Sequence, residues 1–138
     1  MKTRRIYVAG ASSERQTRAK PVITALQKVG HIITFDWTIS VDQCCGVDGN
    51  TPLIDVSENV LRAAASNDYK GVVEADTVVL LAPQNFSTGA WVELGIAIGL
   101  ARSIFIGGDV SKCIFALLPN CIRYESDSHV VEALGGIL

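Results

Sequence analysis

The sequence predicts a doubly wound, three-layer α/β sandwich built on a five-stranded parallel sheet. Short apolar runs of strand length alternate along the chain with longer segments of helical spacing. The strand-like runs are apolar at nearly every position, which is typical of parallel strands covered on both faces. With 138 residues, 49% of them hydrophobic, the chain can bury a substantial core. We therefore expect residues 1–138 to form a single domain.

Five segments have the composition of buried strands and are bounded by turn-forming residues. They are residues 5–9 (RIYVA), 31–36 (HIITFD), 77–82 (TVVLLA), 103–107 (SIFIG) and 121–124 (CIRY). Helical segments stand between them, and strands that alternate with helices indicate a parallel sheet with helices on both faces. The expected architecture is flavodoxin-like or Rossmann-like.

Helical spacing is clearest over residues 14–29, where apolar side chains recur on one face and Gly30 is placed to end the helix. Further helices are expected at residues 56–75, 89–101 and 128–138, with a short helix at 111–118. Residues 37–55 are expected to form a long loop, and long loops in compact domains are often functional.

Charge and hydropathy exclude several classes of partner. The net charge of −2 favours neither nucleic acid nor an anionic membrane as a partner. The most apolar run, residues 94–108, is interrupted by Arg102 and is too short to span a bilayer. The N-terminal residues pass quickly into a strand pattern without the apolar core of a signal peptide, so the expected location is the cytoplasm.

The cysteines and histidines indicate no metal centre. The four cysteines include an adjacent pair, Cys44 and Cys45, but no CxxC motif. The sequence therefore supports neither a zinc site nor a redox motif, and the cysteines are interpreted as buried or incidental thiols. His31 and His129 lie far apart in the sequence. No metal or other cofactor is expected.

The turn "GASSERQ" follows the first predicted strand, where ligands bind in doubly wound sheets. It contains neither GxGxxG nor a Walker lysine, so a dinucleotide or triphosphate site is not supported. Ser12, Ser13 and Arg15 offer hydroxyls, backbone N–H groups and a guanidinium at a helix start, which suits a single phosphate. The alternative is that Ser12 or Ser13 only caps the helix.

The turn "QNFSTG" precedes the predicted helix 89–101 and has the same two interpretations. Ser87 or Thr88 can cap that helix. Gly89, which has no side chain, lets a ligand approach the backbone closely.

Glu93 is the only charged residue between Pro83 and Arg102. Its helix is apolar nearly all round, and an unpaired buried carboxylate costs several kcal/mol. Glu93 therefore either pairs with a base or faces a cavity, where the nearby helix N-terminus favours its ionised form and a nucleophilic role. Gly89 and Glu93 are about 6 Å apart along a helix axis, which is close to the size of a ribose ring.

Three motifs together resemble the nucleoside 2-deoxyribosyltransferase family, which includes the 2'-deoxynucleoside 5'-monophosphate N-glycosidases. They are "IYVAG" at 6–10, "ND" at 67–68 followed by "GVVEADTVVLL", and "STGAWVELG" at 87–95. The motifs stand in the family's order. The resemblance covers most of the chain up to about Gly108, whereas residues 38–55 match nothing in the family.

The resemblance implies roles for individual residues. Glu93 would attack the anomeric carbon of the deoxyribose, Tyr7 would orient Glu93, and Asp68 would lie near the leaving base. The position six before the glutamate is an acid in the transferases and a phosphate-binding serine in the monophosphate glycosidases. It is Ser87 in this chain. Trp37 would lie near the base and stack on it, with plain core packing as the alternative.

These observations favour cleavage of the N-glycosidic bond of a 2'-deoxynucleoside or its 5'-monophosphate through a covalent deoxyribosyl-glutamate, with the monophosphate hydrolase as the preferred form. The alternatives are a transferase that exchanges bases, a non-catalytic nucleotide-binding or sensing module, and an NAD glycohydrolase. Because the C-terminal third of family members helps to complete a neighbouring subunit's site, the resemblance also implies a homodimer or a higher homo-oligomer.

Overall fold

A computed structural model describes residues 2–45 and 55–138 and contains a five-stranded sheet of order β2-β1-β3-β4-β5. All neighbouring strands in it are parallel. The strands are β1 (Arg5–Ala9), β2 (Ile32–Ile33), β3 (Thr77–Leu81), β4 (Ser103–Gly107) and β5 (Cys121–Tyr124). The doubly wound α/β prediction is confirmed, and the strand order reverses between β1 and β3.

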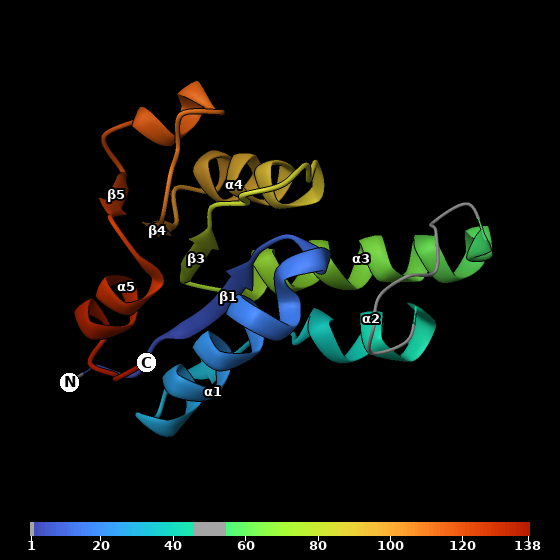
Figure 1. The fold of residues 1–138 in the computed structure, drawn as a ribbon, viewed down its shortest axis with the longest axis horizontal. Coiled ribbons are helices and arrows are strands. Elements are labelled where there is room, and N and C mark those ends of the chain that lie inside the picture. Colours follow the sequence, from blue (N-terminus) through green and yellow to red (C-terminus); the bar gives the residue numbers. More distant parts are fainter. Residues whose placement is uncertain (1, 46–54) are drawn as a thin grey trace.

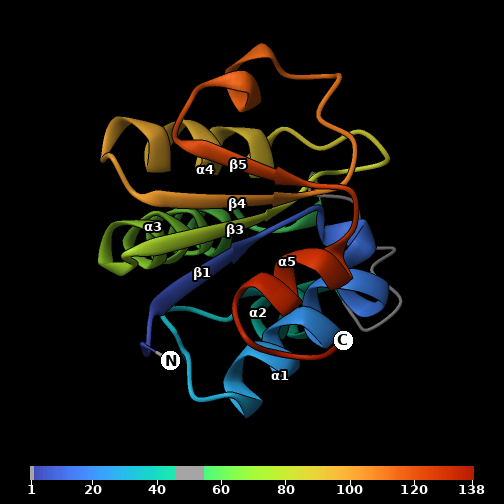
Figure 2. The same cartoon turned by 90° about the vertical axis from the view of Figure 1, so that its left-hand side faces the viewer.

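Helices cover both faces of the sheet (Figures 1 and 2). Helices α1 (Lys20–Lys28) and α5 (Asp127–Ala133) pack together on one face, and α3 (Glu58–Glu74) and α4 (Gly89–Gly99) pack together on the other. Helix α2 (Trp37–Cys45) lies against α3. In the part of the chain that the structure describes, no helix is long and apolar enough to cross a membrane.

The segment predicted as one helix over residues 14–29 has three parts. A 3-10 turn (Ser12–Glu14) leads into a π-helical turn (Arg15–Ala19), and α1 begins only at Lys20. Pro21 is one of the first residues of α1. Because proline has no N–H to donate to the carbonyl of Thr17, the regular ladder cannot extend through this turn. The wider turn accommodates the missing bond.

The predictions of a strand at residues 31–36 and of a loop at residues 37–55 were partly wrong. Strand β2 has only two residues, and residues 37–45 are helical. The cause is Asp36, whose Oδ1 accepts hydrogen bonds from the backbone N–H and the hydroxyl of Thr38. This is the bonding of a helix N-cap, so the chain leaves the sheet and enters α2. Residues 46–54 of the predicted loop lie outside the described residues.

Two predicted helices near the C-terminus are shorter than expected. The segment 111–118 contains only a 3-10 turn over Ile114–Leu117. The closing helix was predicted to reach residue 138, but α5 ends at Ala133. Gly135 has a φ of 89°, a left-handed conformation that glycine adopts readily and that ends helices.

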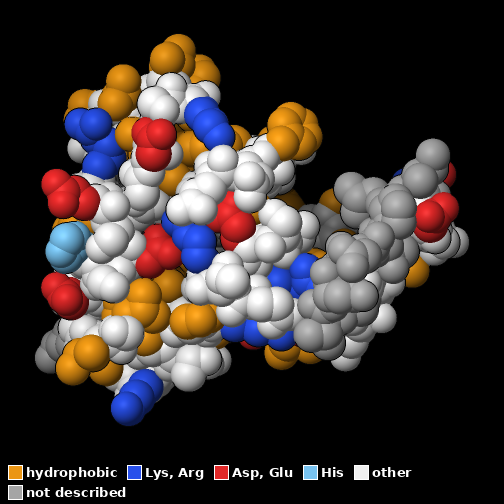
Figure 3. Space-filling model, in the orientation of Figure 1, with side chains coloured by type: hydrophobic (Ala, Val, Ile, Leu, Met, Phe, Trp, Pro, Cys, Tyr) orange, Lys and Arg blue, Asp and Glu red, His pale blue; other side chains and the backbone are white. Residues whose placement is uncertain are grey.

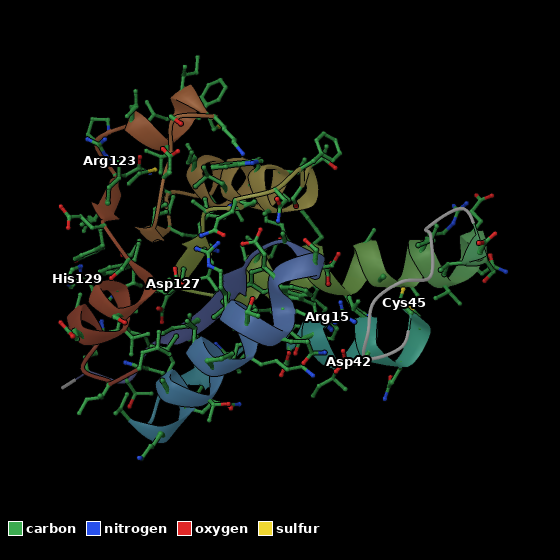
Figure 4. All side chains as sticks on the ribbon, in the orientation of Figure 1. Arg15, Asp42, Cys45, Arg123, Asp127 and His129 are labelled. Atoms are coloured by element: carbon green, nitrogen blue, oxygen red, sulfur yellow. The ribbon has the colours of Figure 1, made fainter. Side chains whose placement is uncertain are left out.

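Arg18 joins the turns at the carboxyl edge of the sheet. Its Nε and Nη2 donate to the two carboxylate oxygens of Asp127 at 2.8 and 2.9 Å. Its Nη1 donates to Glu14 at 2.5 Å and to the carbonyl of Ala82 at 2.7 Å. Glu14 in turn accepts the backbone N–H of Gln84 at 3.0 Å. In Figure 3, basic and acidic side chains gather in the middle of this face, and Figure 4 labels Asp127 there.

We expect Arg18→Met to lower the free energy of unfolding by about 3 kcal/mol, because it leaves two largely buried carboxylates without their counter-charge. Urea unfolding followed by circular dichroism measures the loss. Arg62→Met is the matched control, since Arg62 pairs with Glu58 on the surface with 74% of its side chain exposed. Its loss should stay under about 1 kcal/mol. Equal losses in the two variants would contradict a structural role for the Arg18 network.

Candidate active site

Tyr7, Asp68 and Glu93 lie together between the sheet and the helices α3 and α4. Tyr7 is in the middle of β1 and is completely buried. Its hydroxyl donates a hydrogen bond of 2.5 Å to Oε2 of Glu93, which is in the second turn of α4 and partly buried. Asp68 on α3 is also partly buried, and its charge acts on both Tyr7 and Glu93. The structure therefore places the three predicted catalytic residues side by side.

Because Gly71 has no side chain, the Tyr7 ring can pack closely against α3. A Cβ atom at this position would lie 2.8 Å from Cδ2 of Tyr7 and 2.8 Å from Cβ of Phe35. Gly71 is three residues after Asp68, so both residues lie on the helix face that is turned to the sheet. The sequence analysis missed Gly71, although a glycine inside a helical pattern signals a close approach of this kind.

Burial changes the protonation of the two carboxyl groups. Burial, and secondarily the charge of Asp68, raise the pKa of Glu93 to about 8, although the Tyr7 hydrogen bond opposes this. Burial also raises the pKa of Asp68 to about 6. The pKa of Tyr7 lies far above its ordinary value because of burial and the nearby Glu93. The expectation that a helix N-terminus keeps Glu93 ionised is thus outweighed by desolvation.

Glu93 has no cationic partner among the described residues. Its polar contact is the hydroxyl of Tyr7. Arg102, the nearest base in the sequence after it, instead donates from Nη2 to the carbonyl of Val73 at 2.9 Å. Within residues 2–45 and 55–138, Glu93 therefore does not form the structural ion pair that was the alternative interpretation.

The start of α4 is open to a ligand. Thr88 occupies the N-cap position, but its side chain makes no capping hydrogen bond. Ser87 is partly buried and Gly89 is exposed. A Cβ atom at Gly89 would meet nothing within 4 Å. The unbonded N–H groups of a helix start attract anions, so this end of α4 can receive a phosphate.

The turn after β1 is held by ion pairs rather than by side-chain caps. Ser12 and Ser13 are exposed, and neither caps the first helical turn. Arg15 is only 3% exposed. Its Nε donates to Asp42 at 2.8 Å and its Nη1 to the carbonyl of Ser12 at 2.8 Å, an arrangement that Figure 4 shows next to α2. Asp42 also pairs with Lys20.

Trp37 packs in the core. It is 6% exposed, and its indole N–H donates to the carbonyl of Val8 at 2.7 Å. The core-packing interpretation therefore describes its position in this structure. Stacking of its ring on a base stays a prediction.

Two cavities lie at the carboxyl edge, away from Glu93. One of about 310 Å³ is bounded by the turns after β3 and β4 and includes Arg18 and Lys112. The other, of about 510 Å³, lies beside β5 and includes Arg123. Neither is lined by Tyr7, Asp68 or Glu93. The candidate site is therefore defined by its side chains and their bonds.

Comparison with known proteins shows a likeness of fold. No family model matches the chain, and no curated protein matches its sequence. Among solved structures the chain is similar to a CMP N-glycosidase, BcmB, of Clostridium botulinum, with a TM-score of 0.58 and 14% identity. The alignment covers 94% of this chain and 96% of that one. The roles of the site residues, the oligomeric state and the location in the cell stay predictions.

We expect Gly71→Ala to displace the Tyr7 ring and break its hydrogen bond to Glu93. Because that bond lowers the pKa of Glu93, the pKa should rise further, which carboxyl-carbon NMR titration measures. Gly95→Ala on α4 is the control, since a Cβ atom there meets nothing within 4 Å. It should leave the pKa unchanged and stabilise the helix by up to about 1 kcal/mol. An unchanged pKa in Gly71→Ala would contradict this role.

Proposed function

We propose that this chain is an enzyme that cleaves the N-glycosidic bond of 2'-deoxynucleosides or their 5'-monophosphates, with the monophosphates as the preferred substrates and water as the final acceptor. The observation that carries the proposal is the Tyr7–Glu93 hydrogen bond, because it positions a carboxyl group that no cation neutralises among the described residues. The fold shared with a CMP N-glycosidase supports the same class of reaction. The family resemblance of the three motifs points in the same direction.

In the proposed reaction, the Glu93 carboxylate attacks the anomeric carbon through an oxocarbenium-like transition state. The electron pair of the glycosidic bond leaves with the base, which accepts a proton from Asp68. Water then attacks the same carbon, Asp68 takes a proton from it, and Glu93 departs as a carboxylate. Tyr7 orients Glu93 through its hydroxyl, and the 2.5 Å hydrogen bond between them supports this role. Two displacements retain the configuration at the sugar carbon.

The 5'-phosphate is assigned to the start of α4. Ser87 can donate its hydroxyl to a phosphate, and the uncapped N–H groups from Gly89 onward favour an anion. Glu93 is one helical turn further along, about 6 Å from Gly89, so the sugar bridges the two ends. Ser12 and Ser13 extend the phosphate site from the turn after β1, and in this proposal Arg15 holds that turn through Asp42.

In the proposed reaction, Glu93 and Asp68 both react in the less populated of their protonation states, an arrangement called reverse protonation. The reactive form needs Glu93 ionised and Asp68 protonated, whereas their pKa values of about 8 and about 6 favour the opposite distribution. At pH 7 roughly one molecule in a hundred then carries the reactive combination.

We therefore expect kcat/KM to rise with pH up to about 6, stay highest between about 6 and 8, and fall above about 8. Asp68→Asn cannot donate the proton, so its activity should be lower and should persist above pH 8, with the alkaline limb lost. Glu132→Gln changes an exposed carboxyl group and should keep both limbs. An alkaline limb that survives in Asp68→Asn would contradict the assignment of Asp68.

The activity itself is tested by a product-resolved screen of deoxynucleosides, ribonucleosides and their 5'-monophosphates, each with and without a second free base. We expect free base and a sugar 5'-phosphate, and Glu93→Ala should lower kcat by at least about 1,000-fold while binding is kept. Ser87→Asp should lower kcat/KM for monophosphates at least about tenfold, by charge repulsion, and affect nucleosides less.

Other outcomes of this screen point to the alternatives. A new nucleoside in the presence of the second base indicates base exchange. Binding of nucleotides without any product indicates a nucleotide-binding or sensing module and contradicts the proposal.

A further inference from the structure

Two adjacent cysteines, Cys44 and Cys45, are the last residues of helix α2. Sγ of Cys44 lies 2.9 Å from Sγ of Cys45. Successive side chains of a regular α-helix point about 100° apart around its axis, so a separation this short requires both side chains to turn toward each other. A disulfide bond is about 2 Å long. The two sulfur atoms therefore lie close to bonding distance.

The two thiols differ in accessibility in a way that suits two-step oxidation. Cys44 is exposed, whereas Cys45 is buried. A small reagent reaches Cys44 first, and Cys45 then lies within reach of whatever forms there. The remaining cysteines, Cys113 and Cys121, belong to the β5 side of the sheet, where Cys121 is bonded to the carbonyl of Phe115.

We propose that Cys44 and Cys45 form a reversible oxidation site, at which a low-molecular-weight disulfide such as oxidised glutathione converts the two thiols into a disulfide between neighbouring residues. The Cys44 thiolate attacks one sulfur of the reagent, forms a mixed disulfide and releases one small thiol. The Cys45 thiolate then attacks the Cys44 sulfur and releases the second small thiol. Both protein thiols are oxidised and the reagent is reduced to two thiols, so electrons and protons balance.

The geometry predicts that this disulfide is easily reduced. Neighbouring Cα atoms are about 3.8 Å apart, whereas disulfides usually join Cα atoms about 4.4–6.8 Å apart. Bonds forced outside that range are strained, and strained disulfides have the higher reduction potentials of labile, regulatory bonds. Hydrogen bonding to Cys45 raises the pKa of the Cys44 thiol, and the charge of Arg15 opposes this. Oxidation should therefore become faster as pH rises.

The proposal does not rest on the proposed glycosidase reaction, since neither cysteine touches Tyr7, Asp68 or Glu93 in any described contact. Its structural effect is local. Closing the small ring draws Cys45 away from helical geometry, which loosens the last turn of α2. Asp42, which pairs with Arg15 and Lys20, lies one turn before that point.

The test treats the reduced full-length chain with excess oxidised glutathione, followed by alkylation and mass spectrometry. We expect two of the four thiols to become unreactive, the mass to fall by two hydrogen atoms, and a single peptide to contain both oxidised cysteines. Dithiothreitol should restore all four. Cys113→Ser is the matched control and should still lose two thiols. Cys44→Ser should lose none to an internal disulfide.

A second measurement does not depend on oxidation. Phenylarsine oxide bridges two neighbouring thiols, so one equivalent should bind tightly to the reduced wild type and to Cys113→Ser, but not to Cys44→Ser. A stable glutathione adduct on Cys44, a disulfide that includes Cys113 or Cys121, or four thiols that stay reactive while a reduced cysteine peptide in the same tube is oxidised would each overturn the proposal.

Discussion

One guanidinium, that of Arg18, binds together the chain segments that surround the carboxyl edge of the sheet. Its donors reach the carboxylates of Glu14 and Asp127 and the carbonyl of Ala82, which follows β3. A weaker contact of 3.5 Å reaches the carbonyl of Gly107 at the end of β4. Burying these charges is costly unless every group is paired. The network therefore specifies one arrangement of the turns, and the turn after β3 leads directly to α4 and Glu93.

Two glutamates illustrate how the environment decides the chemistry of one residue type. Glu14 is 7% exposed and has Arg18 and two backbone N–H groups as partners. Glu93 has a phenol as its partner, and burial, with a smaller effect of the charge of Asp68, raises its pKa to about 8 although the Tyr7 hydrogen bond opposes the rise. Because the folded state holds that proton more tightly than the unfolded state, its contribution to stability is present below about pH 4.5 and is lost as pH rises through about 8. Ionised Glu93 in its buried position thus lowers the stability of the fold, and the rest of the structure offsets this loss.

The elements that could be predicted are those whose signal lies in the apolar pattern. The strands β1, β3, β4 and β5 were found within a residue, because most positions in them are apolar, although only Cys121 of β5 is buried. The isolation of Glu93 in an apolar helix marked it as a candidate site residue before any contact was known. Its charge state was misjudged, because desolvation depends on how deeply a side chain is buried, and the burial of Glu93 arises from packing between distant parts of the chain.

The helix and strand ends that the sequence analysis missed depend on a single polar atom, or on the absence of one atom or side chain. Asp36 ends the second strand early by capping α2, Pro21 widens the turn before α1, and Gly135 ends α5. Each of these signals is local, but a pattern based on apolar periodicity does not weigh them. The pairing of Arg15 with Asp42 joins residues 27 positions apart, so no local pattern contains it.

The brevity of β2 has a consequence for how the molecule behaves in a crowded solution. It forms one edge of the sheet and has only two residues. Immediately afterwards Thr34 turns its hydroxyl to the carbonyl of Gly71, and Asp36 starts a helix. A longer edge would present a row of unpaired N–H and C=O groups on which a strand of another molecule could assemble. With so little edge on that side, runaway sheet growth between copies, the route to fibrils, has almost no template there.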